Sequence, residues 1–368
     1  MIVVNASNIS KGGSEQVTLS IISYLNLTDN ILVIAPRNCK VLLQSLSDNN
    51  IRHVLIDYSP PSNFIKYFKY TFSLYNIYKK LTYNSILNVF GPVYFFWDRS
   101  KTISGFANAA IFTNNNKSSI RNRILHITTS LIKQFFLFFE SKYFWVESNL
   151  AMKMLHTNLR IPQNRIIVAF NAPSTQFVSY PFKLKKIMGV PKIFYPAVYR
   201  VHKNHILLAK FLEFTKLDIE LWVTMDAKSY NEVFKGDPKV KNLGYINHNV
   251  LPFYYDQSDI IINTSELEIF SAVLIESHVA LRPLISVDEK YAYDLISSEG
   301  AFYFMQNNLQ SLESTIRFVV DNYIYLGKKL QHLRESTLKK YSPMERALII
   351  SNFSRSIVNK NNTTTLDA

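Results

Sequence analysis

Short apolar runs alternate with amphipathic stretches along nearly the whole chain, and this alternation restricts the possible folds more than any other feature. The apolar runs are typical of buried strands, and the stretches between them have the spacing of helices. Strands that alternate with helices in this way predict parallel βαβ units in a doubly wound α/β sheet. In the first half we expect strands at 2–5, 31–35, 53–57, 86–90, 109–112, 144–147 and 165–170, and helices at 14–25, 41–47, 64–81 and 119–140.

The alternation lapses between residues 171 and 186, where Pro173 and Pro181 stand among polar residues. Such a composition is typical of an interdomain connection. A chain of 368 residues also exceeds what one hydrophobic core usually serves, so two successive α/β domains are expected. In the second half the pattern predicts strands at 193–196, 218–224, 243–246, 259–264, 283–287 and 302–304, and helices at 204–214, 250–257, 271–280 and 309–353.

The charge balance points to anionic partners. The chain has 41 Lys and Arg against 27 Asp and Glu, a formal net charge of +14, which favours nucleic acid, an acidic membrane surface or phosphorylated ligands. The single cysteine, Cys39, excludes an internal disulfide framework and indicates a reducing compartment. The start of the chain lacks the pattern of a signal peptide, and no uncharged apolar run reaches the length of a membrane span, so a soluble or peripheral protein is expected.

Two glutamates follow the strand expected at 259–264. Glu268 lies on the loop after this strand, and Glu276 lies on the next helix. Ligands of open α/β sheets bind at the carboxyl ends of strands, which is where this loop must lie. Glu276 could accept two hydrogen bonds from a vicinal diol such as a ribose, and Glu268 could reach the hydroxyls of a sugar. Alternatively, both are ordinary carboxylates that complement the helix dipole.

The same loop leads into the start of a helix, where backbone N–H groups have no partner within the helix. These N–H groups form a site for a phosphate, aided by the helix dipole. The residues concerned are Phe270, Ser271 and Ala272.

This segment resembles the donor-binding signature of the retaining glycosyltransferase family 4, which reads Glu-Gly-Phe-Gly, then Glu-Ala, then Gly-x-Pro-Val-Ile. The matching positions are Glu268, Phe270, Glu276, Pro283 and Ile285. The signature's glycines are replaced by Ile269, Ser271 and Arg282, which limits close backbone approach to a diphosphate.

Further matches to this family run in the same order along the chain, some of them to a subgroup of bacterial surface-polysaccharide assembly. They are Gly12-Gly13, Phe90-Gly-Pro92, Gly105-Phe-Ala107, Asn171-Ala-Pro173, Tyr195-Pro-Ala197 and His202-Lys-Asn204. The resemblance places Gly12 and Gly13 near the acceptor and the donor phosphates. No Gly-x-Gly-x-x-Gly follows the first strand, so a dinucleotide coenzyme is not expected.

Lys203 follows a predicted strand and opens a predicted helix. An ammonium at this place can neutralise a diphosphate and stabilise a leaving nucleotide. Arg200 is close enough in sequence to be its partner, although the family's arginine position is Val198 here. The alternative for both cations is a solvated surface position.

Metal chemistry is not expected. The sequence has no Asp-x-Asp motif and no His/carboxylate cluster with metal spacing, and no Gly-x-Ser-x-Gly elbow of a serine hydrolase. His53, His126 and His156 occupy no motif position, so the group that activates an acceptor remains unidentified.

Two predicted first-domain helices mix aromatic residues with cations, over 64–80 and 121–139. Basic amphipathic helices of this kind lie in membrane interfaces, held by apolar burial and anionic lipid. Alternatively, the aromatic faces pack on the sheet and the lysines are simply exposed. The net charge and a lipid-linked substrate favour the membrane.

The resemblance implies the GT-B fold, in which two Rossmann-like domains face each other across a cleft. We expect residues 1–172 to bind the acceptor, with 343–368 packing back on them, and 173–342 to bind the donor. The activity implied is metal-independent, retaining transfer from a UDP- or GDP-sugar to a lipid-linked or growing glycan of bacterial O-antigen or capsule, at the inner face of the cytoplasmic membrane. The alternatives are a GT-B nucleotide-sugar epimerase or hydrolase, and a basic nucleic-acid-binding protein, for which no motif stands out.

Overall fold

The computed structural model describes residues 1–9, 13–57, 64–113, 120–296 and 299–364. Its contacts divide the chain into two compact units. Unit 1 comprises Met1–Asn171 together with Pro343–Ala368, and unit 2 comprises Ala172–Ser342.

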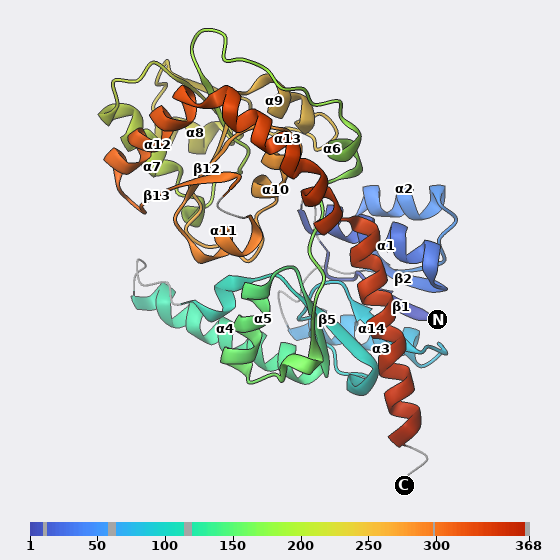
Figure 1. Cartoon of the computed structure of the whole chain (residues 1–368). Helices are drawn as coiled ribbons and strands as arrows, with labels where there is room; N and C mark the ends of the chain where they lie inside the picture. Colours follow the sequence, from blue (N-terminus) through green and yellow to red (C-terminus); the bar gives the residue numbers. More distant parts are fainter. Residues whose placement is uncertain (10–12, 58–63, 114–119, 297–298, 365–368) are drawn as a thin grey trace. The chain divides into compact units, whose positions relative to one another are not determined.

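Unit 1 is built on a seven-stranded sheet in which all paired strands are parallel (Figure 1). The strand order is β3-β2-β1-β4-β5-β6-β7. The order reverses between β1 and β4, which creates a topological switch point at their carboxyl ends. The strands are β1 (Ile2–Asn5), β2 (Ile31–Pro36), β3 (His53–Ile56), β4 (Ser85–Asn88), β5 (Thr102–Phe106), β6 (Tyr143–Val146) and β7 (Ile166–Val168).

The helices of unit 1 bury apolar faces against this sheet, and the central strands are buried on both faces, as parallel strands require. Its α-helices are α1 (Gly13–Thr28), α2 (Lys40–Asp48), α3 (Phe64–Tyr78), α4 (Ile120–Glu140), α5 (Asn149–Leu159) and α14 (Pro343–Thr364). Short 3-10 helices are η1 (Arg99–Lys101), η2 (Ala109–Phe112) and η3 (Gln163–Arg165).

The C-terminal helix α14 packs along α1, as the red and blue helices of Figure 1 show. Arg346 is buried at this contact and donates from Nη1 to Asn171 Oδ1 and from Nη2 to Ser20 Oγ, the latter at 2.6 Å. Ser354 Oγ lies 2.7 Å from Ser85 Oγ on β4. These contacts fix α14 as an integral part of unit 1.

Unit 2 has a six-stranded sheet, again with parallel pairs, in the order β10-β9-β8-β11-β12-β13. Its switch point lies between β8 and β11. The strands are β8 (Lys192–Tyr195), β9 (Glu220–Val223), β10 (Val240–Asn242), β11 (Ile260–Asn263), β12 (Leu284–Val287) and β13 (Ala301–Phe304). The helices are α6 (Thr175–Ser179), η4 (Val201–Lys203), α7 (His205–Phe214), α8 (Ala227–Phe234), α9 (Leu251–Gln257), α10 (Ala272–Val279), α11 (Lys290–Leu295), α12 (Leu309–Asp321) and α13 (Tyr323–Lys340).

The prediction of a strand at 109–112 is wrong. The strand lies earlier in the sequence, at β5, and Ala109–Phe112 form the 3-10 helix η2. The Asn108 side chain accepts a hydrogen bond from the Ala110 N–H and starts this helical turn. Close packing explains why residue 105 on β5 is a glycine. A Cβ there would collide with the Val89 carbonyl oxygen and the Trp145 indole. The strand predicted at 243–246 lies earlier, at β10.

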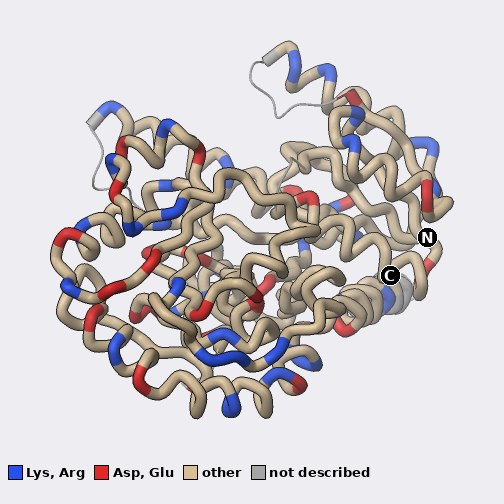
Figure 2. The backbone as a smooth tube through the Cα atoms, turned by 90° about the horizontal axis from the view of Figure 1, so that it is seen from above, with Lys and Arg blue, Asp and Glu red and all other residues tan. Residues whose placement is uncertain are grey.

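Lysine and arginine are spread over both units, as Figure 2 shows. Within the described residues, no helix is long and apolar enough to cross a membrane.

Candidate active site

The candidate site lies in unit 2 at its switch point, between the loops that follow β8 and β11. Parallel strands carry their ligand sites at this place because the two loops diverge there. The first loop ends in η4 and Lys203, and the second carries Glu268 ahead of α10.

Lys203 and Glu268 form an ion pair between Nζ and Oε1. Both side chains are partly buried. Ser265 Oγ donates a second hydrogen bond to the same carboxylate oxygen at 2.8 Å. The structure therefore brings together two of the predicted site residues, which are 65 positions apart in the sequence.

The backbone around this ion pair is fixed by hydrogen bonds between the two loops. The carbonyl of Lys203 accepts from Tyr195 Oη and from Thr264 Oγ1, each at 2.8 Å. The N–H of Glu266 donates to the carbonyl of His202 at 2.8 Å. The position of the ammonium and that of the carboxylate are thus set by the main chain.

A buried polar triad lies beneath the second loop. Asn263, at the end of β11, donates from Nδ2 to Ser286 Oγ at 3.0 Å and to Tyr291 Oη at 2.7 Å. Tyr291 in turn donates to the carbonyl of Ser265 at 2.7 Å. Burial raises the pKa of Tyr291, so the phenol stays protonated and holds the loop.

The first turn of α10 points its N–H groups out of the helix at the end of this loop. Ser271 precedes the helix in an extended conformation and is only 3 % exposed. In the part of the chain that the structure describes, its Oγ has no hydrogen-bond partner and does not cap the helix. The N–H groups of the first turn, including that of Ala272, are therefore not satisfied by this side chain and can receive an anion.

Two hydrophobic side chains of this loop pack against neighbouring residues. Ile269, at the position of a signature glycine, is buried. The ring of Phe270 contacts the ring of Tyr341 edge to face, with centroids 6.2 Å apart.

Glu276 lies on α10, and its Oε2 accepts a 2.8 Å hydrogen bond from Tyr255 Oη on α9. Burial raises the pKa of Glu276 to about 7, and the hydrogen bond from Tyr255 opposes part of this rise. The carboxyl group therefore changes charge near neutral pH.

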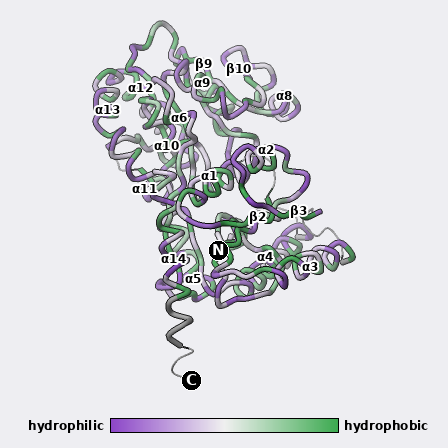
Figure 3. The backbone as a smooth tube through the Cα atoms, turned by 90° about the vertical axis from the view of Figure 1, so that its right-hand side faces the viewer, coloured by the Kyte–Doolittle hydropathy of each residue, from purple (hydrophilic) through white to green (hydrophobic). Residues whose placement is uncertain are grey.

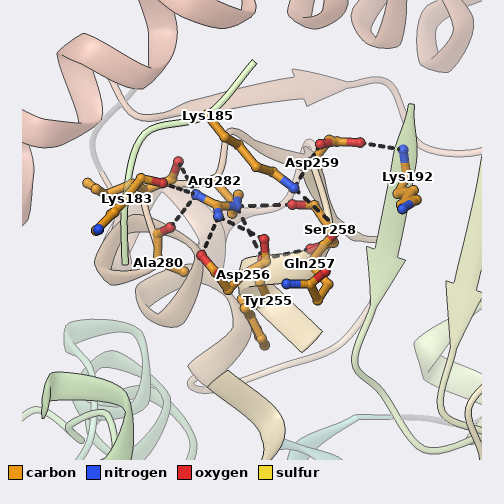
Figure 4. A network of polar contacts seen from close by, with 11 residues as sticks. Lys183, Lys185, Lys192, Tyr255, Asp256, Gln257, Ser258, Asp259, Ala280 and Arg282 are labelled. Carbon is orange, nitrogen blue, oxygen red and sulfur yellow. Dashed lines mark hydrogen bonds and ion pairs between the residues drawn. The ribbon is translucent and has the colours of Figure 1, made fainter. Parts of the chain in front are cut away.

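Arg282, the other departure from the signature, is fully buried in the turn between α10 and β12 (Figure 4). Its Nε donates to the carbonyls of Tyr255 and Ser258, and its Nη2 donates to the carbonyl and to Oδ1 of Asp256. Nη1 donates to the carbonyls of Lys183, Ala280 and Leu281. A guanidinium at the C-terminal end of α9 thus satisfies its last carbonyls and holds the helix that carries Tyr255.

The remaining predicted residues lie outside this cluster. Arg200 is exposed, and its Nη1 donates to the carbonyl of Tyr199 at 3.2 Å. Gly13 is the first residue of α1 in unit 1 and is exposed, and Gly12 lies outside the described residues. Tyr255, Thr264, Ser265 and Tyr291 were not predicted, because hydroxyl groups that support a site have no pattern of their own in a single sequence.

His, Cys, Asp and Glu side chains do not gather in groups of three that could hold a metal ion, as far as the described residues go.

The sequence matches no protein-family profile and no curated protein. Solved structures do match over nearly the whole chain. A glycosyltransferase from Rickettsia africae aligns with a TM-score of 0.74 at 18% identity, covering 97% of this chain and 98% of that chain. HepE of Anabaena, in complex with UDP and glucose, aligns with a TM-score of 0.71 at 12% identity, covering 96% of this chain and 99% of that chain. The chain has the GT-B fold.

A third structure with this GT-B fold is WaaG, a glycosyltransferase involved in lipopolysaccharide biosynthesis. It aligns with a TM-score of 0.68 at 12% identity, covering 95% of this chain and 99% of that one. Two of these three structures are glycosyltransferases, and at 18% identity or less the likeness shows a shared fold.

Proposed function

We propose that the protein is a retaining glycosyltransferase that moves a sugar from a UDP- or GDP-sugar to a lipid-linked or growing glycan, in the synthesis of bacterial O-antigen or capsule. The observation that carries the proposal is the Lys203–Glu268 ion pair at the switch point, beside the uncapped first turn of α10. An ammonium and free N–H groups suit a diphosphate, and a carboxylate suits sugar hydroxyls. HepE bound to UDP and glucose supports the donor class.

In the reaction, the bond between the anomeric carbon and the diphosphate oxygen breaks, and its electron pair leaves with the diphosphate. The acceptor oxygen would bond to that carbon, and its proton would pass to an oxygen of the departing diphosphate. Lys203, with Arg200 as a second cation, would stabilise the charge that develops on the leaving group. The N–H groups of Phe270, Ser271 and Ala272 would contact the same phosphates.

The ion pair itself would change on donor binding. A diphosphate that pairs with the Lys203 ammonium would release Glu268 from the ion pair. The Glu268 carboxylate could then accept hydrogen bonds from the donor sugar. Glu276 would hold the ribose hydroxyls from the side of α10. In this proposal the ligand-free site keeps both charged groups paired until the donor arrives.

Donor binding would belong to unit 2 and acceptor binding to unit 1. A lipid-linked acceptor is held in a membrane, so the enzyme would act as a peripheral protein on the inner face of the cytoplasmic membrane. No metal ion is required, because the cation and the N–H groups supply the positive charge that the leaving group needs.

The test is a panel of UDP- and GDP-sugars with a membrane extract as the acceptor, comparing wild type with Lys203→Ala and Glu268→Gln. We expect both variants to lose transfer while keeping the folded circular dichroism spectrum of the wild type. The exposed pair Lys228 and Glu232 on α8 provides the matched controls Lys228→Ala and Glu232→Gln. Wild-type transfer rates in both site variants would contradict the assignment of Lys203 and Glu268 to the site. Product formed from nucleotide-sugar without acceptor would favour an epimerase or hydrolase.

A further inference from the structure

The outer face of α3 carries large apolar side chains although the helix already buries another face. Tyr70, Leu74 and Tyr78 form the buried face against the sheet. The exposed stripe recurs at helical spacing and includes Phe72, which is 66 % exposed. Its members are Ile65, Phe68, Phe72 and Tyr75.

Helix α4 has the same two-sided character. It buries Leu137 and Glu140, whereas Leu131 and Phe135 are 59 % and 53 % exposed. The whole exposed apolar stripe comprises Ile124, Leu125, Ile127, Leu131, Ile132, Phe135 and Phe139. Exposed apolar residues that stand singly are ordinary, but a stripe of this length marks an interaction surface.

Ring contacts join the two stripes into one surface, which we call the apolar face of unit 1. Tyr67 of α3 meets Phe136 of α4 with ring centroids 6.2 Å apart, and the two helices lie next to each other in Figure 3. Phe96, on the loop between β4 and β5, stacks on Phe136 at 5.1 Å and contacts Phe135 at 6.3 Å. Phe96 is itself exposed, so it extends the face between the helices.

The charged side chains of the two helices have one sign, and Asp98, two residues after Phe96, is paired with Lys101. Residues 64–80 and 121–139 contain no Asp or Glu, and the acidic residue that ends α4, Glu140, is buried. The cations in these ranges are Lys66, Lys69, Lys79, Lys80, Arg121, Arg123 and Lys133. A second copy of the chain would bring like charges together, whereas an anionic lipid surface supplies both opposite charge and apolar depth.

We propose that the apolar face of unit 1, formed by α3, Phe96 and α4, inserts into the boundary between headgroups and acyl chains of an anionic phospholipid bilayer. Its cations would lie at the level of the lipid phosphates. The inference rests on the proposed function for its purpose, since it names the surface that would bring the enzyme to a lipid-linked acceptor. Lipid binding itself can be measured without any transfer reaction.

The experiment is flotation of the full-length protein with phosphatidylcholine vesicles, with and without phosphatidylglycerol. We expect binding to the anionic vesicles that weakens with added salt, and a partition coefficient at least about tenfold lower for Phe72→Ser combined with Phe135→Ser. Phe214→Ser combined with Phe253→Ser, two exposed phenylalanines of unit 2, is the matched control and should bind like wild type. Equal binding by the face variant and the control would overturn the proposal.

A second measurement covers the case in which the double variant does not fold. Phe72→Trp should show a blue-shifted emission with anionic vesicles and quenching by brominated acyl chains; an unchanged spectrum would contradict insertion. Light scattering that finds a wild-type dimer, lost in the Phe72→Ser and Phe135→Ser variant, would identify a second copy as the occupant and overturn the lipid assignment.

UDP binding by thermal shift, without vesicles, separates the two proposals. Protein that binds UDP but not vesicles contradicts only the lipid surface. Protein that binds vesicles through this face but gains no stability from any nucleotide or nucleotide-sugar contradicts only the proposed function.

Discussion

The hydroxyl of Tyr255 donates a 2.8 Å hydrogen bond to Oε2 of Glu276, and the helix that carries this tyrosine is held by Arg282. The donor-binding carboxylate of the proposal is therefore oriented by a residue from another helix. Removing the hydroxyl by Tyr255→Phe should raise KM for the nucleotide-sugar by about three- to tenfold, with a smaller change in kcat. Steady-state kinetics checks this, and Tyr254→Phe on the same helix serves as the control. An unchanged KM would mean that the hydrogen bond is only structural.

The pH dependence of donor binding follows from the raised pKa of Glu276. Burial raises this pKa to about 7, and only the ionised carboxylate accepts both ribose hydrogen bonds. Affinity should therefore be highest above this value and should fall as the pH drops through it. Titration calorimetry with UDP, at points spaced from roughly pH 5.5 to pH 8.5, measures how the affinity depends on pH. A Glu276→Gln variant that keeps the wild-type pH dependence would refute the assignment to this residue.

The ion pair with Glu268 should lower the affinity of Lys203 for a diphosphate. Glu268→Gln frees the ammonium, so the Kd for UDP alone should fall by about three- to tenfold. Transfer should nevertheless decrease, because the carboxylate that contacts the donor sugar is gone. Measuring UDP binding and transfer on one preparation tests both halves of the prediction, and weaker UDP binding in this variant would contradict it.

Lys203→Ala should act mainly on the chemical step. Removing one preorganised donor to developing negative charge typically costs about 10²–10³ in kcat, and we expect a loss of this order here. Single-turnover transfer at saturating donor would isolate this effect from binding. Arg200→Ala should cost less, since Arg200 is exposed and outside the ion pair.

Arg282→Met should destabilise unit 2 strongly. The substitution leaves the carbonyls of Asp256 and Ser258 without their donor, removes one of two donors from the Tyr255 carbonyl, and removes the buried partner of the Asp256 carboxylate. Breaking a buried pair of this kind costs about 3–5 kcal/mol of unfolding free energy. Urea unfolding followed by circular dichroism measures it, with Arg317→Met, which removes an exposed guanidinium from its ion pair with Glu313, as the control. Equal midpoints for the two variants would contradict this account of Arg282.

The sequence predicted both parallel sheets because buried parallel strands are continuous apolar runs, as Ile260-Ile-Ile262 is. The same rule failed at Ala109-Ala-Ile-Phe112, which is equally apolar but follows the capping residue Asn108 and forms a 3-10 turn. The short helices α8 and α11 were missed, since eight and six residues leave little helical periodicity to detect.

Within the candidate site, Lys203 and Glu268 were named from their positions after strands. Their ion pair could not be predicted, because the contact depends on β8 and β11 being neighbours in the sheet. Arg282 was recognised only as a lost glycine. Its role required knowing that the C-terminal end of α9 lies against the turn after α10.

The position of α14 in unit 1 has a consequence for synthesis at the ribosome. The helix that covers α1 is encoded after the whole of unit 2, and its Arg346 completes contacts to Ser20 and Asn171. Unit 2 emerges as an uninterrupted segment and can reach its native state while translation continues. Unit 1 keeps part of its apolar surface uncovered until α14 has left the exit tunnel.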